Sequence, residues 1–390
     1  MREAGRVRIW RITVLALTFL PLVCKAQTLV YTNNNNYFAA NTVSGYLIKP
    51  NGEALEVGGS PFQTGGEGNG ANGYIAATRI TACAKFLFAS NDYSGTVSGF
   101  AIDPLSGLLT AVPGSPFTVN GADSEGIPIA ITSDCRFLFA GDLNIFRIFA
   151  FQISPAGSLT QVVGSPFSVP WFPGTLKLSN QNKFLAVALN GVGVAMYTIG
   201  SDGALTAVPG SPFSASPEAE GFGETEIDCR TRFLYLPETF NKIDVFSIAP
   251  NGALALIAGS PFASPANNAV AVLSPSQEFL FTSNESWGVN GFLALTNGDI
   301  EGLPWSPFNA GLVSSSGLAI NQAGTMLFVS DFDSITTEFS VINVMKVAET
   351  GTPTLWPGSP VSTGQNGGMF SLISYPPRTC PPLGPPVPSN

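Results

Sequence analysis

Short runs in which apolar and polar residues alternate recur along the chain and predict β-strands. Two examples are Thr96–Ile102 and Lys242–Ile248. A two-residue period is typical of strands that bury one face. No stretch of useful length places apolar residues at the i, i+3 and i+4 positions of a helix. The pattern therefore predicts an all-β fold.

A tetrapeptide, Gly-Ser-Pro-Phe or a close variant, marks seven copies of a longer unit. Its prolines are Pro61, Pro116, Pro166, Pro212, Pro261, Pro307 and Pro360. Successive copies are 46 to 55 residues apart, a period typical of propellers and solenoids. Each copy contains four predicted strands, as one propeller blade does. We expect a seven-bladed β-propeller of four antiparallel strands per blade, in which proline ends an outer edge strand and phenylalanine packs between blades.

The two ends of the repeat array predict how the ring closes. The first unit begins at residues 28–32 and lacks an innermost strand, whereas a spare strand at about 369–373 follows the seventh motif. We expect the spare strand to complete the first blade, because this leaves no open blade edge. A single propeller domain then covers residues 27–375, and residues 376–390 are expected to form an extended proline-rich tail.

The first 26 residues are predicted to be a signal peptide. Four arginines precede the apolar run Ile12–Val23, which is too short to span a bilayer as a helix. Small residues then precede a cleavage point before Gln27. Lipid attachment at Cys24 is the less favoured alternative, because Val23 is bulky where such sites require a small residue. We expect a secreted, periplasmic or cell-envelope protein with no transmembrane helix after signal removal.

Composition narrows the chemistry that this fold can use. The chain contains no histidine, which excludes histidine-based acid–base catalysis, histidine metal ligands and Ser-His or Cys-His nucleophiles. Removing residues 1–26 leaves 12 basic and 25 acidic residues, so nucleic acid and anionic lipid should be repelled. No metal or cofactor is predicted. The expected partner of the monomer is a small molecule, a carbohydrate or a surface protein.

The repeat unit resembles those of the lactonase-like seven-bladed propellers, which include cytoplasmic 6-phosphogluconolactonase. The opening Leu29-Val-Tyr-Thr-Asn33 also resembles the Tyr-Val-Thr-Asn repeat of surface propellers. The resemblance covers about residues 28–374; it implies the propeller fold and allows sugar lactone hydrolysis. Inner strands of that family often begin with Pro-His and continue to a Pro-Asp-Gly turn. This chain has neither, so no catalytic residue carries over.

Three charged residues share one position on the predicted innermost strands and are the candidate catalytic residues: Arg79, Lys177 and Glu226. Lys177 and Glu226 belong to successive blades, so one interpretation is a structural ion pair between blades. Arg79 has no partner at an adjacent position of this kind. The alternative is a site facing the channel, in which Glu226 acts as a base toward water and a cation stabilises the oxyanion.

A second polar position recurs where each predicted second strand ends. It is filled by Asn34, Asn91, Asp142, Glu238, Asn284 and Asp331, and the fourth unit has Leu189 there with Asn190 next. Asn and Asp in such places commonly cap turns by bonding the backbone. The alternative is a polar rim at the channel mouth, suited to a sugar or a cation. Together with Trp171, in a loop on the same face, these residues are the ligand-binding candidates.

Four cysteines follow the signal sequence, and export permits disulfides. Cys83 and Cys135 occupy the same turn in successive blades and form the preferred pair. Pairing of Cys380 with Cys83 is the alternative, and Cys229 is expected to pair with neither.

The leading functional hypothesis is a ligand- or protein-binding module that acts through its loop face. Lactone hydrolysis is the first alternative. A purely structural role in the cell envelope is the second.

Overall fold

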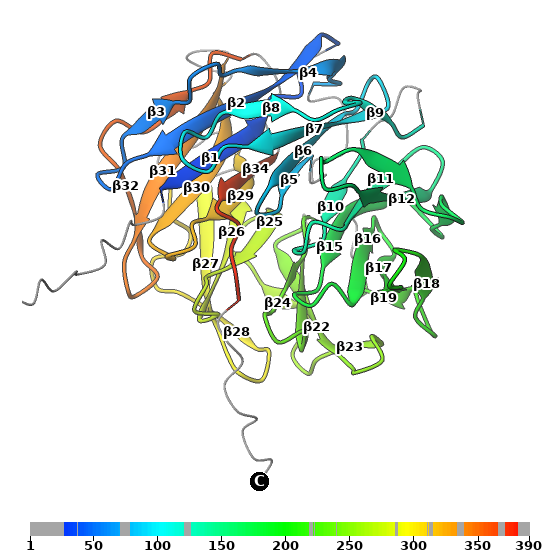
Figure 1. Cartoon of the computed structure of the whole chain (residues 1–390). Coiled ribbons are helices and arrows are strands. Elements are labelled where there is room, and N and C mark those ends of the chain that lie inside the picture. The colour runs from blue at the N-terminus through cyan, green and yellow to red at the C-terminus, as the bar shows by residue number, and fades with distance from the viewer. Residues whose placement is uncertain are drawn as a thin grey trace, which may run out of the picture.

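The computed structural model forms seven sheets arranged around a central channel (Figure 1). It describes residues 27–36, 38–70, 79–120, 126–217, 221, 223–238, 240–284, 288–309, 311, 315–333, 339–365 and 371–380. Within these ranges there are strands and turns but no helix, and therefore none that could cross a membrane. The seven-bladed all-β propeller predicted from the sequence is confirmed.

Each blade runs outward from the channel through four antiparallel strands. The first, innermost strands are β34 (Ser371–Tyr375), β5 (Ile80–Ala82), β10 (Ile129–Ile131), β15 (Pro173–Leu178), β20 (Glu226–Ile227), β25 (Asn268–Leu273) and β29 (Ser315–Ile320). The second strands are β1 (Thr28–Asn33), β6 (Phe86–Asn91), β11 (Phe137–Asp142), β16 (Phe184–Leu189), β21 (Phe233–Glu238), β26 (Phe279–Asn284) and β30 (Met326–Asp333).

The outer half of each blade continues the same order. The third strands are β2 (Ala40–Ile48), β7 (Thr96–Ile102), β12 (Arg147–Ile153), β17 (Gly193–Ile199), β22 (Lys242–Ile248), β27 (Gly288–Ala294) and β31 (Phe339–Val347). The fourth strands are β3 (Ala54–Glu56), β8 (Leu109–Ala111), β13 (Leu159–Gln161), β18 (Leu205–Ala207), β23 (Leu254–Leu256), β28 (Ile300–Gly302) and β32 (Pro353–Leu355). In six blades a further edge strand returns to pair with the third: β4 (Phe62–Glu67), β9 (Phe117–Thr118), β14 (Phe167–Ser168), β19 (Phe213–Ser214), β24 (Phe262–Ala263) and β33 (Val361–Ser362).

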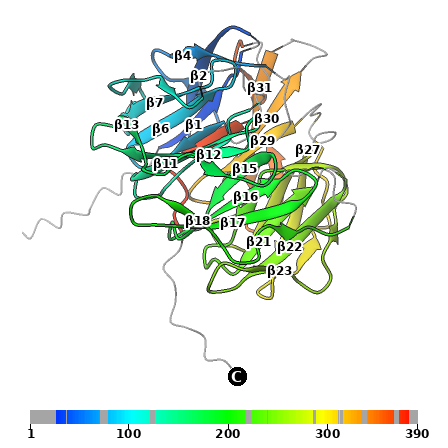
Figure 2. The same ribbon diagram turned by 90° about the vertical axis from the view of Figure 1, so that its right-hand side faces the viewer.

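The ring closes by pairing the two ends of the chain. β34 lies antiparallel to β1, with Tyr375 opposite Leu29 and Ser371 opposite Asn33. Both views show the red β34 beside the blue β1 (Figures 1 and 2). The sequence predicts the closing strand at about 369–373, and the structure has it at 371–375; Met369 lies outside the described residues.

The Ser-Pro-Phe motif fastens the outer edge of every blade. The Ser–Pro peptide bond of each of the seven motif copies is cis. Each serine hydroxyl accepts a hydrogen bond from a backbone N–H of the third strand 15 or 16 residues earlier, as Ser211 does from Met196 at 2.9 Å. The same contact recurs at Ser60, Ser115, Ser165, Ser260, Ser306 and Ser359, at 2.9–3.1 Å. The proline therefore lies between two segments of the edge rather than at the end of one.

The hydrophobic core is divided among the interfaces between neighbouring blades. Phe184 and Val194 of the fourth blade, for example, pack against Ile227 and Leu234 of the fifth. Gly252, in a turn of the fifth blade, has a φ of +90° and touches Phe184 so closely that a Cβ would lie 2.6 Å from the ring. Such contacts hold the inner strands in fixed positions around the channel.

Candidate functional site

A cavity of about 460 Å³ lies in the central channel. Cys83, Ser133 and Ser179 on its wall belong to the turns that follow the inner strands, so it lies at the opposite end of those strands from the loops that enter them. All seven inner strands contribute to the wall. Its apolar residues include Ile80, Ile131, Leu178, Ile227, Val272, Leu318, Ile320 and Leu372. Its charged residues are Lys177, Glu224, Glu226 and Arg378.

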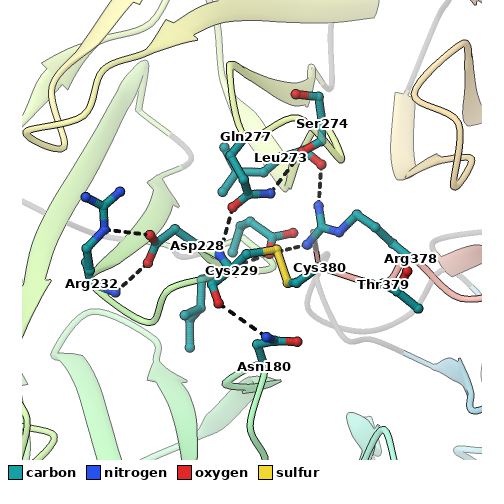
Figure 3. The surroundings of a disulfide bond; sticks show 12 residues. Asn180, Asp228, Cys229, Arg232, Leu273, Ser274, Gln277, Arg378, Thr379 and Cys380 are labelled. Atoms are coloured by element: carbon teal, nitrogen blue, oxygen red, sulfur yellow. Dashed lines mark hydrogen bonds and ion pairs between the residues drawn. A yellow bond between two sulfur atoms is a disulfide. The ribbon is translucent and has the colours of Figure 1, made fainter. Parts of the chain in front are cut away.

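Residues 376–380, which we call the strap, cross this end of the channel. They leave β34 in the first blade and reach the fifth, where Cys380 is joined to Cys229 (Figure 3). The backbone N–H of Thr379 donates to Gln322 of the seventh blade at 2.6 Å. Residues 376–380 are therefore fastened to the propeller; residues 381–390 lie outside the described part of the chain.

Glu226 is the centre of a charged cluster on the cavity wall. Its Oε2 is 3.1 Å from Nζ of Lys177, and its Oε1 accepts a hydrogen bond from Nη2 of Arg378 at 2.8 Å. The backbone N–H of Ile227 also donates to Oε1. The Glu226 side chain is 1% exposed, whereas Lys177 and Arg378 are 25% and 17% exposed. Arg378 also donates to the carbonyl of Leu273 (Figure 3).

The two cations keep the buried carboxylate ionised. Burial alone would raise the pKa of Glu226, but Arg378 and Lys177 outweigh it and the pKa is lowered. Both oxygens already accept hydrogen bonds. A general base works best with a pKa near the working pH, and the pKa of Glu226 is lowered, so this geometry favours the ion-pair interpretation of Lys177 and Glu226 over a catalytic one.

Arg79 does not join this cluster. Its Nε donates to the carboxylate of Asp92 at 2.5 Å, and both side chains are almost fully buried. Asp92 also accepts from Ser90 Oγ and from the N–H of Ile127. Arg79, Lys177 and Glu226, which share one position in the sequence repeat, therefore lie in two separate clusters. Sequence reasoning misses the partner of Arg79 because it compares equivalent positions on the innermost strands, and Asp92 lies in the turn after β6.

The residues at the polar position that recurs where each second strand ends are here called the polar ring. Several of them make contacts within their own blades. The Asn34 amide donates to Thr42 and Ser44, and the Asn91 amide to Thr96 and Ser98. The Asn284 amide donates to Asn290. No ring member lines the cavity. These contacts are with side chains of the third strand, whereas the turn-capping interpretation expects backbone partners.

The acidic members of the ring are also buried. Asp142 accepts the N–H groups of Asn144 and Ile145, and burial nevertheless raises its pKa. Asp331 is 3% exposed and lies opposite Ser315. Asn190 is half-buried beyond β16.

Glu238 differs from the rest of the ring because its neighbour is a second carboxyl group. Burial and then the interaction with Asp244 raise the pKa of Glu238 to about 7, although Lys242 and the Ser216 hydroxyl oppose the shift. Asp244 accepts hydrogen bonds from the N–H of Ser216 at 2.7 Å and from Ser260 Oγ at 3.0 Å. Oε2 of Glu238 is buried and meets no donor among the described residues. A direct bond between the two carboxyl groups requires a shared proton.

Trp171 lies in the loop between β14 and β15 and is 44% exposed. Its ring stacks on Phe146 at 6.0 Å and meets Phe172 edge-on at 5.5 Å. It does not line the cavity. The acidic residues Asp123, Glu125, Glu218 and Glu220, in the corresponding loops of the sequence repeat, are outside the described residues.

Two disulfides border the strap end of the channel. Cys83 is joined to Cys135, the pair preferred from the sequence, and connects the second and third blades. Cys229 is joined to Cys380, at a sequence separation of 151. The expectation that Cys229 pairs with neither cysteine is wrong. It fails because it places Cys380 beside the first blade, whereas the strap carries it across the channel.

Comparisons with known proteins add support for the fold. The sequence matches no known family model and no curated protein sequence. A candidate 6-phosphogluconolactonase from Bacteroides fragilis has a TM-score of 0.70 at 18% identity, over 91% of this chain and 99% of that one. A second candidate, from Bacteroides uniformis, has a TM-score of 0.69 at 16% identity, over 90% and 100%. A periplasmic gluconolactonase from Pseudomonas aeruginosa has a TM-score of 0.67 at 16% identity, over 89% and 98%. The chain shares their propeller fold.

Proposed function

We propose that this protein is a binding module that holds a small molecule in the central channel, against the strap. The observation that carries the proposal is the 460 Å³ cavity, which has a charged cluster on one wall and branched aliphatic residues on the others. Ligand sites are commonly concave and mostly apolar, with a few polar groups that orient the ligand.

The polar groups on the wall suggest the class of ligand. Lys177 has three N–H donors, and its bond to Glu226 uses one. A ligand with oxygen acceptors fits this donor, while its carbon skeleton fits the Ile and Leu side chains. Sugar lactones and aldonic acids have both features and are the first compounds to test.

Lactone hydrolysis is the second candidate function. It is supported by the fold shared with the gluconolactonase of P. aeruginosa and the two Bacteroides proteins. The lowered pKa of Glu226 and its ion pairs with Lys177 and Arg378 favour binding over turnover by that residue.

We also propose that the mature protein begins at Gln27 and works outside the cytoplasm. Two disulfides support an oxidising compartment. Sequencing the amino terminus of protein from fractionated host cells would test this; cytoplasmic protein that retains residues 1–26 would contradict it.

The binding proposal is tested with purified mature protein and a panel of sugar lactones and aldonic acids. Calorimetry measures binding, and pH-stat titration measures turnover of the lactones. We expect binding that weakens at least tenfold in Lys177→Met and is unchanged in the exposed control Lys85→Met. Turnover that is lost in Glu226→Gln would favour the enzyme instead. Absence of binding across the panel would contradict the proposed ligand class.

A further inference from the structure

The strap is fastened more strongly by its disulfide than by its other contacts. It has no strand partner, and two of its five residues are prolines, Pro376 and Pro377. Thr379, which bonds to Gln322, is exposed. Arg378 supplies the one ion pair between the described strap residues and the ring. By contrast, β34 just before the strap has a five-residue ladder with β1.

We propose that the Cys229–Cys380 disulfide is a thiol-operated latch on the channel. Reduction releases residues 376–380, removes Arg378 from Glu226 and opens the strap end of the cavity to solvent. The β34–β1 ladder does not depend on the latch, so the propeller stays closed while the strap leaves. As a regulator of ligand binding, the latch rests on the proposed function of the cavity.

The reductant is a dithiol. Cys380 is half-buried and Cys229 is 4% exposed, so a thiolate attacks Cys380 Sγ and Cys229 leaves as a thiolate that takes up a proton. The second thiol of the reductant then attacks the mixed disulfide. Cys380 leaves in turn and is protonated, and the reductant becomes a cyclic disulfide. Two electrons and two protons pass to the protein.

Release of the strap changes the charge on the cavity wall. Glu226 keeps Lys177 as its partner but loses Arg378, so the cluster loses one positive charge. The strap also covers the wall beside Leu273, whose carbonyl accepts from Arg378 (Figure 3). The reduced protein therefore has a cavity with a wider entrance and a less positive wall.

The test isolates each disulfide in turn. In Cys83→Ser/Cys135→Ser the latch is the disulfide that dithiothreitol can reduce, and in Cys229→Ser/Cys380→Ser the latch is absent. Two rates are measured on the folded mature proteins with and without dithiothreitol. One is amide hydrogen exchange at residues 378–380, and the other is tryptic cleavage after Arg378. Cleavage after the exposed Lys85 is the internal control.

We expect dithiothreitol to raise both rates at least tenfold in the protein that retains the latch. In the protein without the latch, both rates should already be high and should not respond. Unchanged rates on verified reduction would overturn the proposal. If Cys229→Ser/Cys380→Ser fails to fold, the other variant still gives the decision, because its latch is opened after folding. No ligand is involved, so a negative result from the lactone panel leaves this test unaffected.

Discussion

The buried pair of Glu238 and Asp244 should make the stability of the propeller depend on pH near neutrality. At the equivalent position in other blades an asparagine amide donates a hydrogen bond, as Asn34 does to Ser44 and Asn284 does to Asn290. In the fifth blade the donor is the proton on a carboxyl group, which is lost as the pH rises. Glu238→Gln restores an amide donor at any pH and is therefore the informative substitution.

The size of the effect follows from the raised pKa. Burial and Asp244 raise the pKa of Glu238 from 4.5 to about 7. Because the unfolded chain keeps the ordinary value, it releases its proton first as the pH rises, and the folded state loses stability. A tenfold change in an acid dissociation constant corresponds to about 1.4 kcal/mol, so the folded state loses about 3 kcal/mol. This stability is fully present below pH 4.5 and has been lost above about pH 7.

Urea unfolding between pH 4.5 and 8 measures the effect. The free energy of unfolding of Glu238→Gln, relative to that of the wild type, should rise by about 3 kcal/mol across this range. The control is Glu301→Gln, which removes one negative charge from an exposed site on β28 and should follow the wild type. If the wild-type and Glu238→Gln curves run parallel, the two carboxyl groups do not share a proton and the reasoning fails.

Three other contacts give measurable expectations. Glu226→Gln leaves two partly exposed cations without their anion and should lower the free energy of unfolding by about 2 kcal/mol at pH 7. Since the pKa of Glu226 is lowered, this difference from wild type should shrink below pH 4.5. A difference independent of pH would contradict the expectation. Ser211→Ala removes the acceptor for a backbone N–H of β17 and should lower the free energy of unfolding by about 1–2 kcal/mol. The exposed control Ser201→Ala should lower it by less than about 0.5 kcal/mol. Equal losses would count against a role of the Ser-Pro-Phe motif in fastening the blade edge. Deleting residues 371–390 should abolish cooperative thermal unfolding and deleting 376–390 should preserve it; equal melting temperatures would refute closure by β34.

The sequence predicts the architecture well because the information is periodic. The prolines of the repeated motif count the blades, and the missing inner strand of the first unit reveals the closure. Comparison of equivalent positions in successive repeats also brings Lys177 and Glu226 together, because neighbouring blades place equivalent residues side by side. Physical features that repeat in every blade are therefore visible in the sequence.

Features that occur once are not visible in this way. The strap follows the last repeat, so no comparison of equivalent repeat positions pairs Arg378 with Glu226 or Cys380 with Cys229. The pairing of Glu238 with Asp244 escapes the sequence for a different reason. Both residues fit the repeat as polar positions, and only burial beside Asp244 raises the pKa of Glu238.

Closure by β34 sets an order of events for a growing chain. The inner edge of β1 leaves the ribosome or a translocation pore long before its partner β34 does. Until residue 375 emerges, β1 presents unpaired backbone groups that invite pairing with other chains. Products of premature termination would keep that edge open, however many blades they contain. A chain that lacks only β34 therefore keeps the same open edge as a much shorter one.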